Sequence, residues 1–234
     1  MLWRSNSRFL DMPFSRHMSL TSFYLPLRAR AEAPRMMLTV GKIPYIAKDI
    51  PFPEWMGLKK SGKICHFGQL PSLLLPSGQL ISQSGSICRY VAKLANLYPQ
   101  DPALAADADM VFELAQEMAI INPVANYFQK DSSEWKEKHD GYFSRLPRRL
   151  EAAQKILGDR DYYGGKSPHY GDFGLFHIFD ITLTVQPGSL DAYPKLKAWQ
   201  ERMHGIPGVQ QYITSRPGPS TPGWGIPGTV IMSM

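Results

Sequence analysis

The first residues that could do chemistry together lie early in the chain. Tyr24 lies near the end of a short β-prone run, and Pro26, Arg28 and Arg30 follow closely, so the order predicts a strand end, a turn and a helix start. A phenolic O–H is a hydrogen-bond donor that can stabilise an anion held beside it. The alternative is that Tyr24 is an ordinary aromatic strand residue.

A second group is predicted to open a helix at Ser84, because Ile87, Val91 and Leu94 fall on one helical face. A helix N-terminus offers unpaired backbone N–H groups and the positive end of the helix dipole, so it favours a bound anion. Donors from Ser84 and Gln83 would add to this site. The alternative is simple N-capping by Ser84 with Gln83 exposed, and the two uses can coexist.

The elements that must position these residues form an α/β unit. Short strands are predicted at 22–25 and 45–47, a helix at 28–40, and a hairpin from Leu73–Leu75 to Leu80–Ile81 across a Pro-Ser-Gly-Gln turn. The order strand, helix, strand, connecting stretch, hairpin, helix builds a small mixed sheet with helices on its faces. That is a thioredoxin-like order.

From about Ala103 the pattern changes to long periodic segments without strand signals. Helices are expected near 103–129, 133–157, 171–185 and 192–204, the last with Leu196, Trp199 and Met203 on one side. The predicted organisation is an extension at 1–17, a thioredoxin-like domain at 18–97, an all-helical bundle at 103–216, and an irregular tail rich in proline and glycine at 217–234.

The motifs and their order resemble cytosolic glutathione transferases of the tyrosine type, most of all the sigma class. Residues 24–32 are similar to the family's Tyr-x-x-x-Arg-Gly-Arg-Ala-Glu segment, 67–71 to its Phe-Gly-Lys/Gln-x-Pro segment, and 83–84 to its Gln-Ser pair. The resemblance covers about residues 18–216. It implies a thioredoxin-like glutathione-binding domain followed by an all-α helical domain.

The resemblance assigns a role to each motif residue. Tyr24 is implied to be catalytic, with its phenol donating a hydrogen bond that keeps the glutathione sulfur as a thiolate. Arg30 is implied to add positive potential near that sulfur. Pro71 is implied to be cis, so that Leu70 offers its backbone N–H and C=O to the cysteinyl part of glutathione, while Gln69 adds a side-chain contact or is a solvated amide.

The two ends of glutathione need donors of their own. Gln83 and Ser84 are implied to receive the γ-glutamyl carboxylate at the helix start. Trp55 and Lys59 resemble a pair that binds the glycyl carboxylate in sigma-like members. The segment from Trp55 to Phe67 is longer than in those members, so Lys60 or Lys63 could take the role instead of Lys59. The alternative for Lys59 is an ordinary surface lysine.

The expected partners are glutathione as co-substrate, a hydrophobic electrophile and a second copy of the chain in a homodimer. Family members borrow an acid from the partner subunit for the γ-glutamyl amine, and Gln116 and Glu117 are the nearest candidates. The electrophile is expected beside residues 25–27 and the first long helix near Met118 and Ile121, and the alternative is that these apolar positions belong to the core. No metal is required by this mechanism, and the sequence shows no metal-ligand spacing.

Three other functions remain in view. The same site could isomerise an endoperoxide or reduce a peroxide with glutathione. A non-catalytic glutathione-binding or structural relative is a second alternative, against which the retained Tyr24, Pro71, Gln83 and Ser84 argue. A thioredoxin-like redox enzyme is a third, and the absence of a Cys-x-x-Cys motif makes it a poor one.

Composition limits the remaining classes. The 234 residues carry a formal charge of +6 without a Lys/Arg run, which argues against nucleic acid, and no long apolar run predicts a membrane helix. Cys65 and Cys88 are too few for a disulfide framework, so a cytoplasmic location is expected. Residues 1–17 are rich in arginine and serine and fit either a disordered extension or an organelle transit peptide.

Two further groups are expected to be structural or inert. His169 to Asp172 resembles the family's capping box at a helix start, so Asp172 is predicted to stabilise that helix. Cys65 and His66 are neighbours on an extended segment and should point to opposite sides, which argues against a nucleophile pair. Cys88 lies on a predicted helix face and should be packed.

Overall fold

The computed structural model describes residues 19–121 and 132–216, and its first part contains a four-stranded sheet. The strands are β1 (Leu20–Tyr24), β2 (Tyr45–Asp49), β3 (Ser72–Leu74) and β4 (Leu80–Ser82). Their order across the sheet is β2-β1-β3-β4, with β1 and β2 parallel and the other pairs antiparallel. The predicted strands and hairpin are confirmed, although β1 begins two residues earlier than expected and ends at Tyr24.

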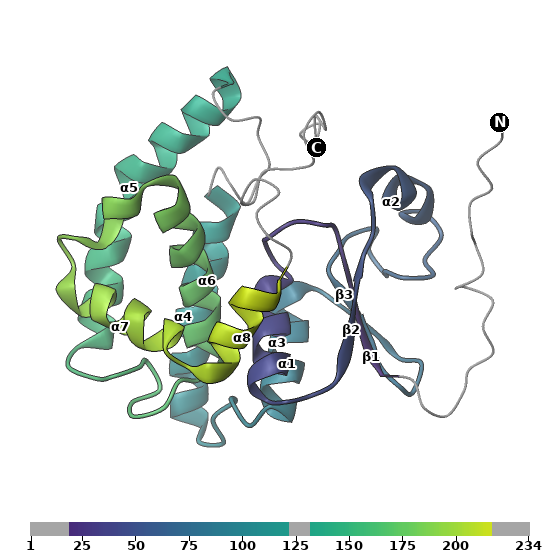
Figure 1. Cartoon of the computed structure of the whole chain (residues 1–234), viewed down its shortest axis with the longest axis horizontal. Coiled ribbons are helices and arrows are strands. Elements are labelled where there is room, and N and C mark those ends of the chain that lie inside the picture. The colour runs from purple at the N-terminus through teal and green to yellow at the C-terminus, as the bar shows by residue number, and fades with distance from the viewer. Residues whose placement is uncertain (1–18, 122–131, 217–234) are drawn as a thin grey trace.

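Three helices belong to this first part: α1 (Glu32–Val40), α2 (Phe52–Leu58) and α3 (Ser84–Leu94). α1 and α3 lie on the side of the sheet that faces the rest of the chain, and α2 lies on the other side (Figure 1). The prediction that α1 begins at Arg28 was wrong, because residues 26–31 form bends and a turn. Pro34 lies in the first helical turn, where the missing N–H removes no bond.

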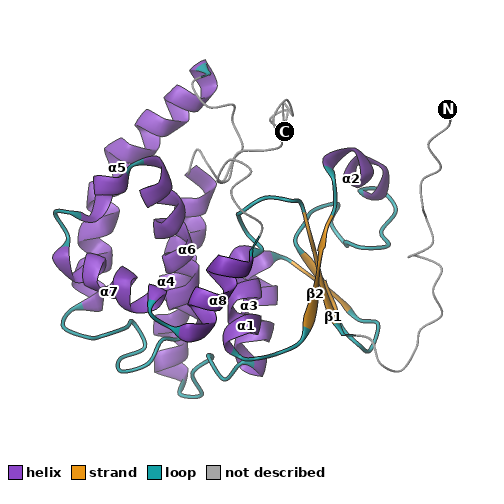
Figure 2. Cartoon of the chain, in the orientation of Figure 1, coloured by secondary structure: helices purple, strands orange, loops and turns teal. Residues whose placement is uncertain are grey.

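The second part is entirely helical in the region described, as Figure 2 shows. Its helices are α4 (Pro102–Ile121), α5 (Ser133–Leu157), α6 (Tyr170–Val185), α7 (Pro194–His204) and α8 (Pro207–Ser215), with a short 3-10 turn at Pro187–Leu190. The four predicted helices are confirmed within the described residues, while 122–129 of the first lie outside them. The sequence did not predict α2 and α8.

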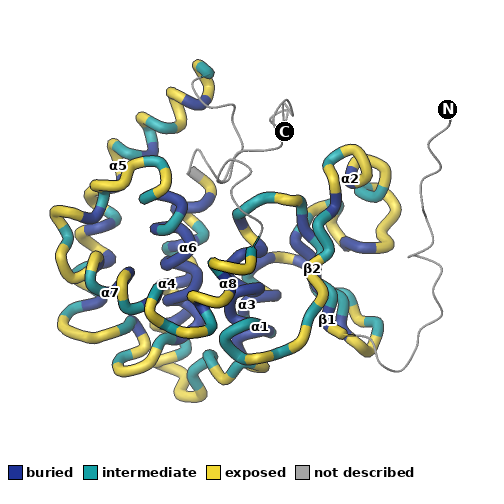
Figure 3. Tube along the Cα trace, in the orientation of Figure 1, coloured by how far each residue is buried: buried dark blue, intermediate teal, exposed yellow. Residues whose placement is uncertain are grey.

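α6 is the centre of the helical part, and Figure 3 shows it buried along most of its length. α4 packs closely against it because two glycines face α4. A Cβ at Gly171 would lie 2.6 Å from the Ala108 carbonyl oxygen, and one at Gly174 would lie 2.7 Å from Phe112 Cδ2. Since real side chains do not approach so closely, these glycines set the distance between the two helices.

One hydrophobic core cluster joins both parts of the chain, and the apolar face predicted on α7 belongs to it. Trp199 is fully buried, as are Leu196 and Met203 on the same side of α7. Leu94 departs from its prediction, because 43% of it is exposed at the end of α3. The helical pattern therefore identified the packed face correctly except in this last turn.

Asp172 stabilises the start of α6, as expected. Its carboxylate accepts hydrogen bonds from the backbone N–H groups of His169 and Tyr163 and from Trp199 Nε1, each at 2.9 Å, and it is fully buried. A carboxylate that receives three donors holds them together more firmly than neutral acceptors would. Asp172 thus joins the helix start, the preceding loop and α7.

The fold is therefore the predicted one: a thioredoxin-like α/β domain followed by an all-helical domain. None of the described helices combines the length and the apolar character needed to cross a membrane. The Cys65 thiol points to the Lys59 carbonyl oxygen at 3.8 Å, whereas His66 Nε2 lies 2.9 Å from the Leu80 carbonyl oxygen, so the two side chains diverge as expected.

Candidate active site

The register of the sheet brings the three sequence motifs to one edge. Phe23 of β1 pairs with Ser72 of β3, and Ser72 pairs with Ser82 of β4. The next residue at this end of each strand therefore belongs to a different motif: Tyr24, Pro71 and Gln83. Segments that are far apart in the sequence are thus adjacent here because neighbouring strands end together.

Tyr24 is held in place by the turn that follows its own strand. Only 4% of the residue is exposed, and it packs with Ala29, Ala31 and Leu70. The backbone N–H of Arg30 donates a hydrogen bond to the Tyr24 phenolic oxygen at 3.2 Å. A donor to this oxygen polarises the phenol, which makes its O–H a stronger donor to an anion.

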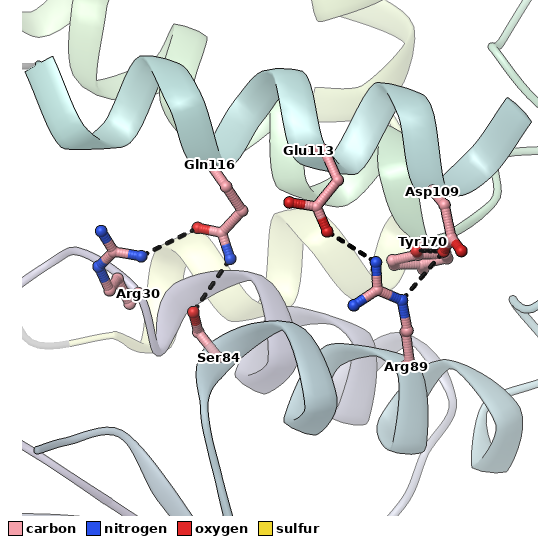
Figure 4. Close-up of polar contacts among 7 residues, drawn as sticks. All are labelled: Arg30, Ser84, Arg89, Asp109, Glu113, Gln116 and Tyr170. Atoms are coloured by element: carbon pink, nitrogen blue, oxygen red, sulfur yellow. Dashed lines mark hydrogen bonds and ion pairs between the residues drawn. The ribbon is translucent and has the colours of Figure 1, made fainter. Parts of the chain in front are cut away.

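The side chain of Arg30 connects the same turn to α4 and α3, as Figure 4 shows. Arg30 Nη1 donates to Gln116 Oε1 at 3.3 Å, and Gln116 Nε2 donates to Ser84 Oγ at 3.0 Å. A continuous set of polar contacts therefore leads from the phenol of Tyr24 to the first residue of α3. These contacts therefore connect a phenol that could donate a hydrogen bond to an anion with the N-terminus of a helix.

The start of α3 differs from a simple cap. Gln83 occupies the N-cap position with φ +74° and no side-chain capping bond, and Ser84 is the first helical residue. The alternative that Ser84 caps the helix is therefore wrong, because its hydroxyl accepts from Gln116 instead. A non-glycine residue at positive φ carries strain that its surroundings must offset. Here it leaves the Gln83 side chain exposed beside the unpaired N–H groups of the helix.

The segment before β3 has the shape implied by the resemblance. The Leu70–Pro71 peptide bond is cis, as predicted. Leu70 is half-buried and packs with both the Tyr24 cluster and the cluster around Trp55, whereas Gln69 is exposed. The side chain of Leu70 therefore packs beside Tyr24, and an extended tripeptide could pair with the backbone of this segment as a strand does.

Trp55 and Lys59 lie one helical turn apart at the end of α2. Trp55 is 6% exposed and packs against Ile64 and Cys65, so most of its ring belongs to a small core. The side chain of Lys59 runs along Gly68, since a Cβ at Gly68 would lie 3.5 Å from Lys59 Cγ. Of the three candidate lysines, this contact places Lys59 beside the 67–71 motif.

Comparisons with known proteins agree with this arrangement. Residues 118–216 match the family model described as "Glutathione S-transferase, C-terminal domain". A glutathione S-transferase of Dirofilaria immitis is 28% identical over 204 residues, which cover 85% of this chain and 94% of the relative. The Pi-class glutathione S-transferase of Onchocerca volvulus has a solved structure that aligns with a TM-score of 0.74 at 29% identity, covering 85% of this chain and 94% of that one.

The chain is therefore similar to glutathione S-transferases, over its helical part by the family model and over most of its length by these relatives. The hematopoietic prostaglandin D synthase of Gallus gallus is also similar, with 29% identity over 197 residues that cover 83% of this chain and 94% of the relative. The relatives therefore carry names of two activities, transfer and isomerisation. The similarity does not choose between these activities.

A small hollow lies between α1, α3, α4 and α6, and its lining differs from the second-substrate region expected from the sequence. Arg30 and Gln116 line it together with apolar residues. Met118 was expected to contact substrate, but it is fully buried in the main core. The side chain of Ile121 lies outside the described residues, and Leu25 packs against the Trp55 cluster. Four other residues of α4 line the hollow instead: Phe112, Ala115, Gln116 and Ala119.

Sequence reasoning missed His177, which also lines this hollow. The signal was available, because His177 interrupts an otherwise apolar run in α6.

Cys88 lines the hollow too and is 1% exposed, which confirms that it is packed. Burial raises the pKa of the Cys88 thiol well above its ordinary range, and so keeps it protonated. Among the described residues, no three metal-ligating side chains gather in one place.

Proposed function

We propose that the chain conjugates glutathione to hydrophobic electrophiles. The Tyr24 phenol would hold the glutathione sulfur as a thiolate, which attacks an electrophilic carbon. The displaced leaving group departs with the electron pair of its broken bond. The observation that carries this proposal is the set of contacts from Tyr24 through Arg30 and Gln116 to Ser84. These contacts connect the phenol that would stabilise the thiolate to the helix N-terminus that would bind the γ-glutamyl carboxylate.

The magnitude of thiol activation explains why one hydrogen bond matters. A free thiol with a pKa of about 8.5 is only roughly 3% ionised at pH 7. Lowering this pKa by about two units, equivalent to roughly 2.7 kcal/mol, would ionise about three quarters of it. The concentration of the nucleophile then rises about twenty-fivefold. Tyr24 needs no general base for this, since it stabilises the product of ionisation.

The remaining contacts to glutathione follow from the positions of the motif residues. Leu70, preceding the cis Pro71, would pair with the cysteinyl backbone, and Gln69 is exposed beside it. Gln83 and Ser84 would bind the γ-glutamyl carboxylate at the α3 N-terminus. The glycyl carboxylate is assigned to two residues at the end of α2: Trp55 and Lys59.

The proposal includes a homodimer, as the resemblance implies, in the cytoplasm where glutathione is kept reduced. Gln116 and Glu117 were the candidates for the residue lent to the partner. Gln116 bonds to Arg30 and Ser84 of its own chain, and Glu117 pairs with Arg149 at 2.8 Å. Because 64% of the Glu117 side chain is exposed, Glu117 is the better candidate for a contact with a second copy.

The second candidate function is isomerisation of an endoperoxide with glutathione regenerated. The Gallus gallus relative named as a prostaglandin D synthase favours it, as does the sigma-like sequence around Tyr24. Relatives named as P-type transferases, such as that of Xenopus laevis at 27% identity, favour conjugation and leave the sigma class as part of the proposal. Both functions use the same Tyr24 thiolate.

One experiment separates these possibilities. The purified chain is incubated with glutathione and, in parallel, with a chromogenic aryl halide, an organic peroxide and a prostaglandin endoperoxide. Release of halide with formation of the thioether supports conjugation. Turnover of the endoperoxide without consumption of glutathione would make the chain an isomerase instead. Binding to immobilised glutathione without any turnover would reject catalysis and identify a binding protein.

A further inference from the structure

Gln116 of α4 lies between the two ends of the proposed glutathione site, as Figure 4 shows. Its carbonyl oxygen accepts a hydrogen bond from Arg30 Nη1 at 3.3 Å, and its amide nitrogen donates to Ser84 Oγ at 3.0 Å. Arg30 also bonds to the Tyr24 phenol through its backbone, and Ser84 is the first residue of α3. One neutral amide therefore contacts both the thiolate end and the carboxylate end of the site.

The chemistry of Arg30 fixes the orientation of this amide. A guanidinium group has only donors, so the group of Gln116 that faces it must be the carbonyl oxygen. The amide nitrogen, which can only donate, then faces Ser84, and the Ser84 oxygen must accept. Within the described part of the chain the Ser84 hydroxyl donates to no acceptor, so its own proton remains available for a bound anion.

A carboxylate in place of the amide would have the opposite effect on both neighbours. It would accept from the Ser84 hydroxyl, so the proton of Ser84 would no longer be available to the γ-glutamyl carboxylate. It would also form an ion pair with Arg30 and reduce the positive potential on that side of the site. The neutral amide of Gln116 avoids both losses.

The acids on either side of Gln116 in α4 do not neutralise Arg30 either. Glu113 pairs with Arg89 at 2.7 Å, and Glu117 pairs with Arg149 at 2.8 Å. In Figure 4 the Glu113 side chain is turned towards Arg89, on the far side of Gln116 from Arg30. Arg30 forms no ion pair with any residue in 19–121 or 132–216, so its charge is left to act on the site itself.

We infer that Gln116 is a positioning residue of the glutathione site. It directs the Ser84 hydroxyl towards the γ-glutamyl carboxylate and holds an unneutralised Arg30 beside Tyr24. The inference rests on the proposed function and deepens it, because it explains how the two ends of the site are prepared together. It also gives Gln116 a role opposite to that of an acid that binds the γ-glutamyl amine, and the two roles predict changes of opposite sign.

Gln116→Glu tests the inference with almost no change in shape. We expect the dissociation constant for glutathione, measured by isothermal titration, to rise about tenfold or more, because the hydroxyl turns away and the new charge repels the ligand carboxylate. The pKa of the bound thiol, followed by ultraviolet absorbance, should rise by about 0.5 to 1 because Arg30 becomes paired. A purely structural role of Gln116 would not move this pKa.

A second ligand isolates the contribution of the carboxylate. The tripeptide analogue 4-aminobutyryl-Cys-Gly lacks only the γ-glutamyl carboxylate, and the wild-type chain should bind it about tenfold more weakly than glutathione. In Gln116→Glu this ratio should fall to about threefold or less. An unchanged ratio would overturn the inference. Tighter binding of glutathione by the variant would overturn it too, since that result is expected of an acid that binds the amine.

Gln211→Glu is the matched control, because it makes the same substitution at an exposed position of α8 and should leave both measurements unchanged. Gln116→Met keeps the test valid if Gln116→Glu does not fold. It removes both hydrogen bonds without adding a charge, so the dissociation constant should rise about two- to tenfold while the thiol pKa stays near its wild-type value.

The outcomes separate this inference from the proposed function. Unchanged glutathione affinity in the folded Gln116 variants, with a wild-type chain that binds and conjugates glutathione, would reject only the role of Gln116. A wild-type chain that does not bind glutathione would reject the proposed function and this inference with it.

Discussion

The backbone N–H of Arg30 lies 3.2 Å from the phenolic oxygen of Tyr24 and donates a hydrogen bond to it. The turn after β1 thus folds back over the last residue of its own strand and fixes the oxygen that would face the glutathione sulfur. Because only 4% of the residue is exposed and it packs against its neighbours, the oxygen and the ring can be tested separately. A substitution that removes only the oxygen should alter chemistry more than structure.

Tyr24→Phe should lower turnover at pH 7 by about tenfold to twenty-fivefold while glutathione affinity stays nearly unchanged. The reason is that the phenol stabilises only the thiolate, whereas the rest of the tripeptide is held by other residues. Titrating the ultraviolet absorbance of the bound thiolate should show a pKa raised towards that of the free thiol. Tyr162→Phe is the matched control, since Tyr162 lies in the loop before α6 and should leave both measurements unchanged. Equal turnover in Tyr24→Phe would remove the phenol from the mechanism.

Ser84→Ala should weaken glutathione binding by about 1 to 2 kcal/mol, because a hydroxyl bonded to a carboxylate is lost at the α3 N-terminus. Isothermal titration with glutathione measures the dissociation constant directly. Ser86→Ala provides the control, since Ser86 is exposed two residues further along the same helix. If the two variants bind glutathione equally well, the carboxylate does not lie at Ser84.

The parts of the site that sequence could predict are those attached to strand ends. Tyr24, Pro71 and Ser84 each follow or precede a short β-prone run, and neighbouring strands of a small sheet end at a common edge. Their proximity therefore follows from local patterns plus one topology. The cis bond before Pro71 was predicted by family resemblance alone, since X-Pro bonds are cis in only about 5 to 6% of cases.

Packing contacts between helices that are far apart in the sequence could not be predicted from such local patterns. The hollow beside His177 depends on how closely α4 and α6 approach, which Gly174 and Phe112 decide in three dimensions. α8 was missed for a related reason: it begins with Pro207 and Gly208, which locally favour a turn. A Cβ at Gly208 would lie 2.7 Å from Val40 Cα, so the glycine is needed for packing on α1. Tertiary contact overrides the local preference there.

Arg216→Met should destabilise the fold by about 3 to 5 kcal/mol, since it removes the positive charge from a buried pair of salt bridges. Arg216 bonds to Glu32 and to Asp180, each at 2.9 Å, and so ties the end of α8 to α1 and α6. Its side chain is only 7% exposed, so Glu32 and Asp180 would lose this positively charged partner in a poorly solvated place, although Glu32 would still accept a hydrogen bond from Tyr212. Urea unfolding at pH 7 measures the change in the free energy of unfolding.

Lys195→Met is the control for this prediction. The Lys195–Asp159 pair has a similar distance of 2.7 Å, but its side chains are 51% and 96% exposed. Exposed pairs contribute about 0 to 1 kcal/mol because water and salt screen them. Equal losses in the two variants would mean that burial of the Arg216 group adds nothing to stability.

The pH dependence of stability should reveal the buried imidazole of His177. Its pKa is lowered in the folded chain, chiefly by burial, so the unfolded chain binds a proton near pH 6.5 that the folded chain does not. The folded state therefore keeps its full stability above about pH 6.5 and loses it as the pH falls below that value. His177→Leu lacks this proton uptake, while the surrounding charges of Glu32, Asp180, Arg28 and Arg216 remain. Between pH 7.5 and 5.5 the wild-type free energy of unfolding should fall by about 1 kcal/mol more than that of the variant, by urea unfolding at both pH values. Parallel curves would show that His177 is protonated equally in both states, and that burial does not lower its pKa in the folded chain.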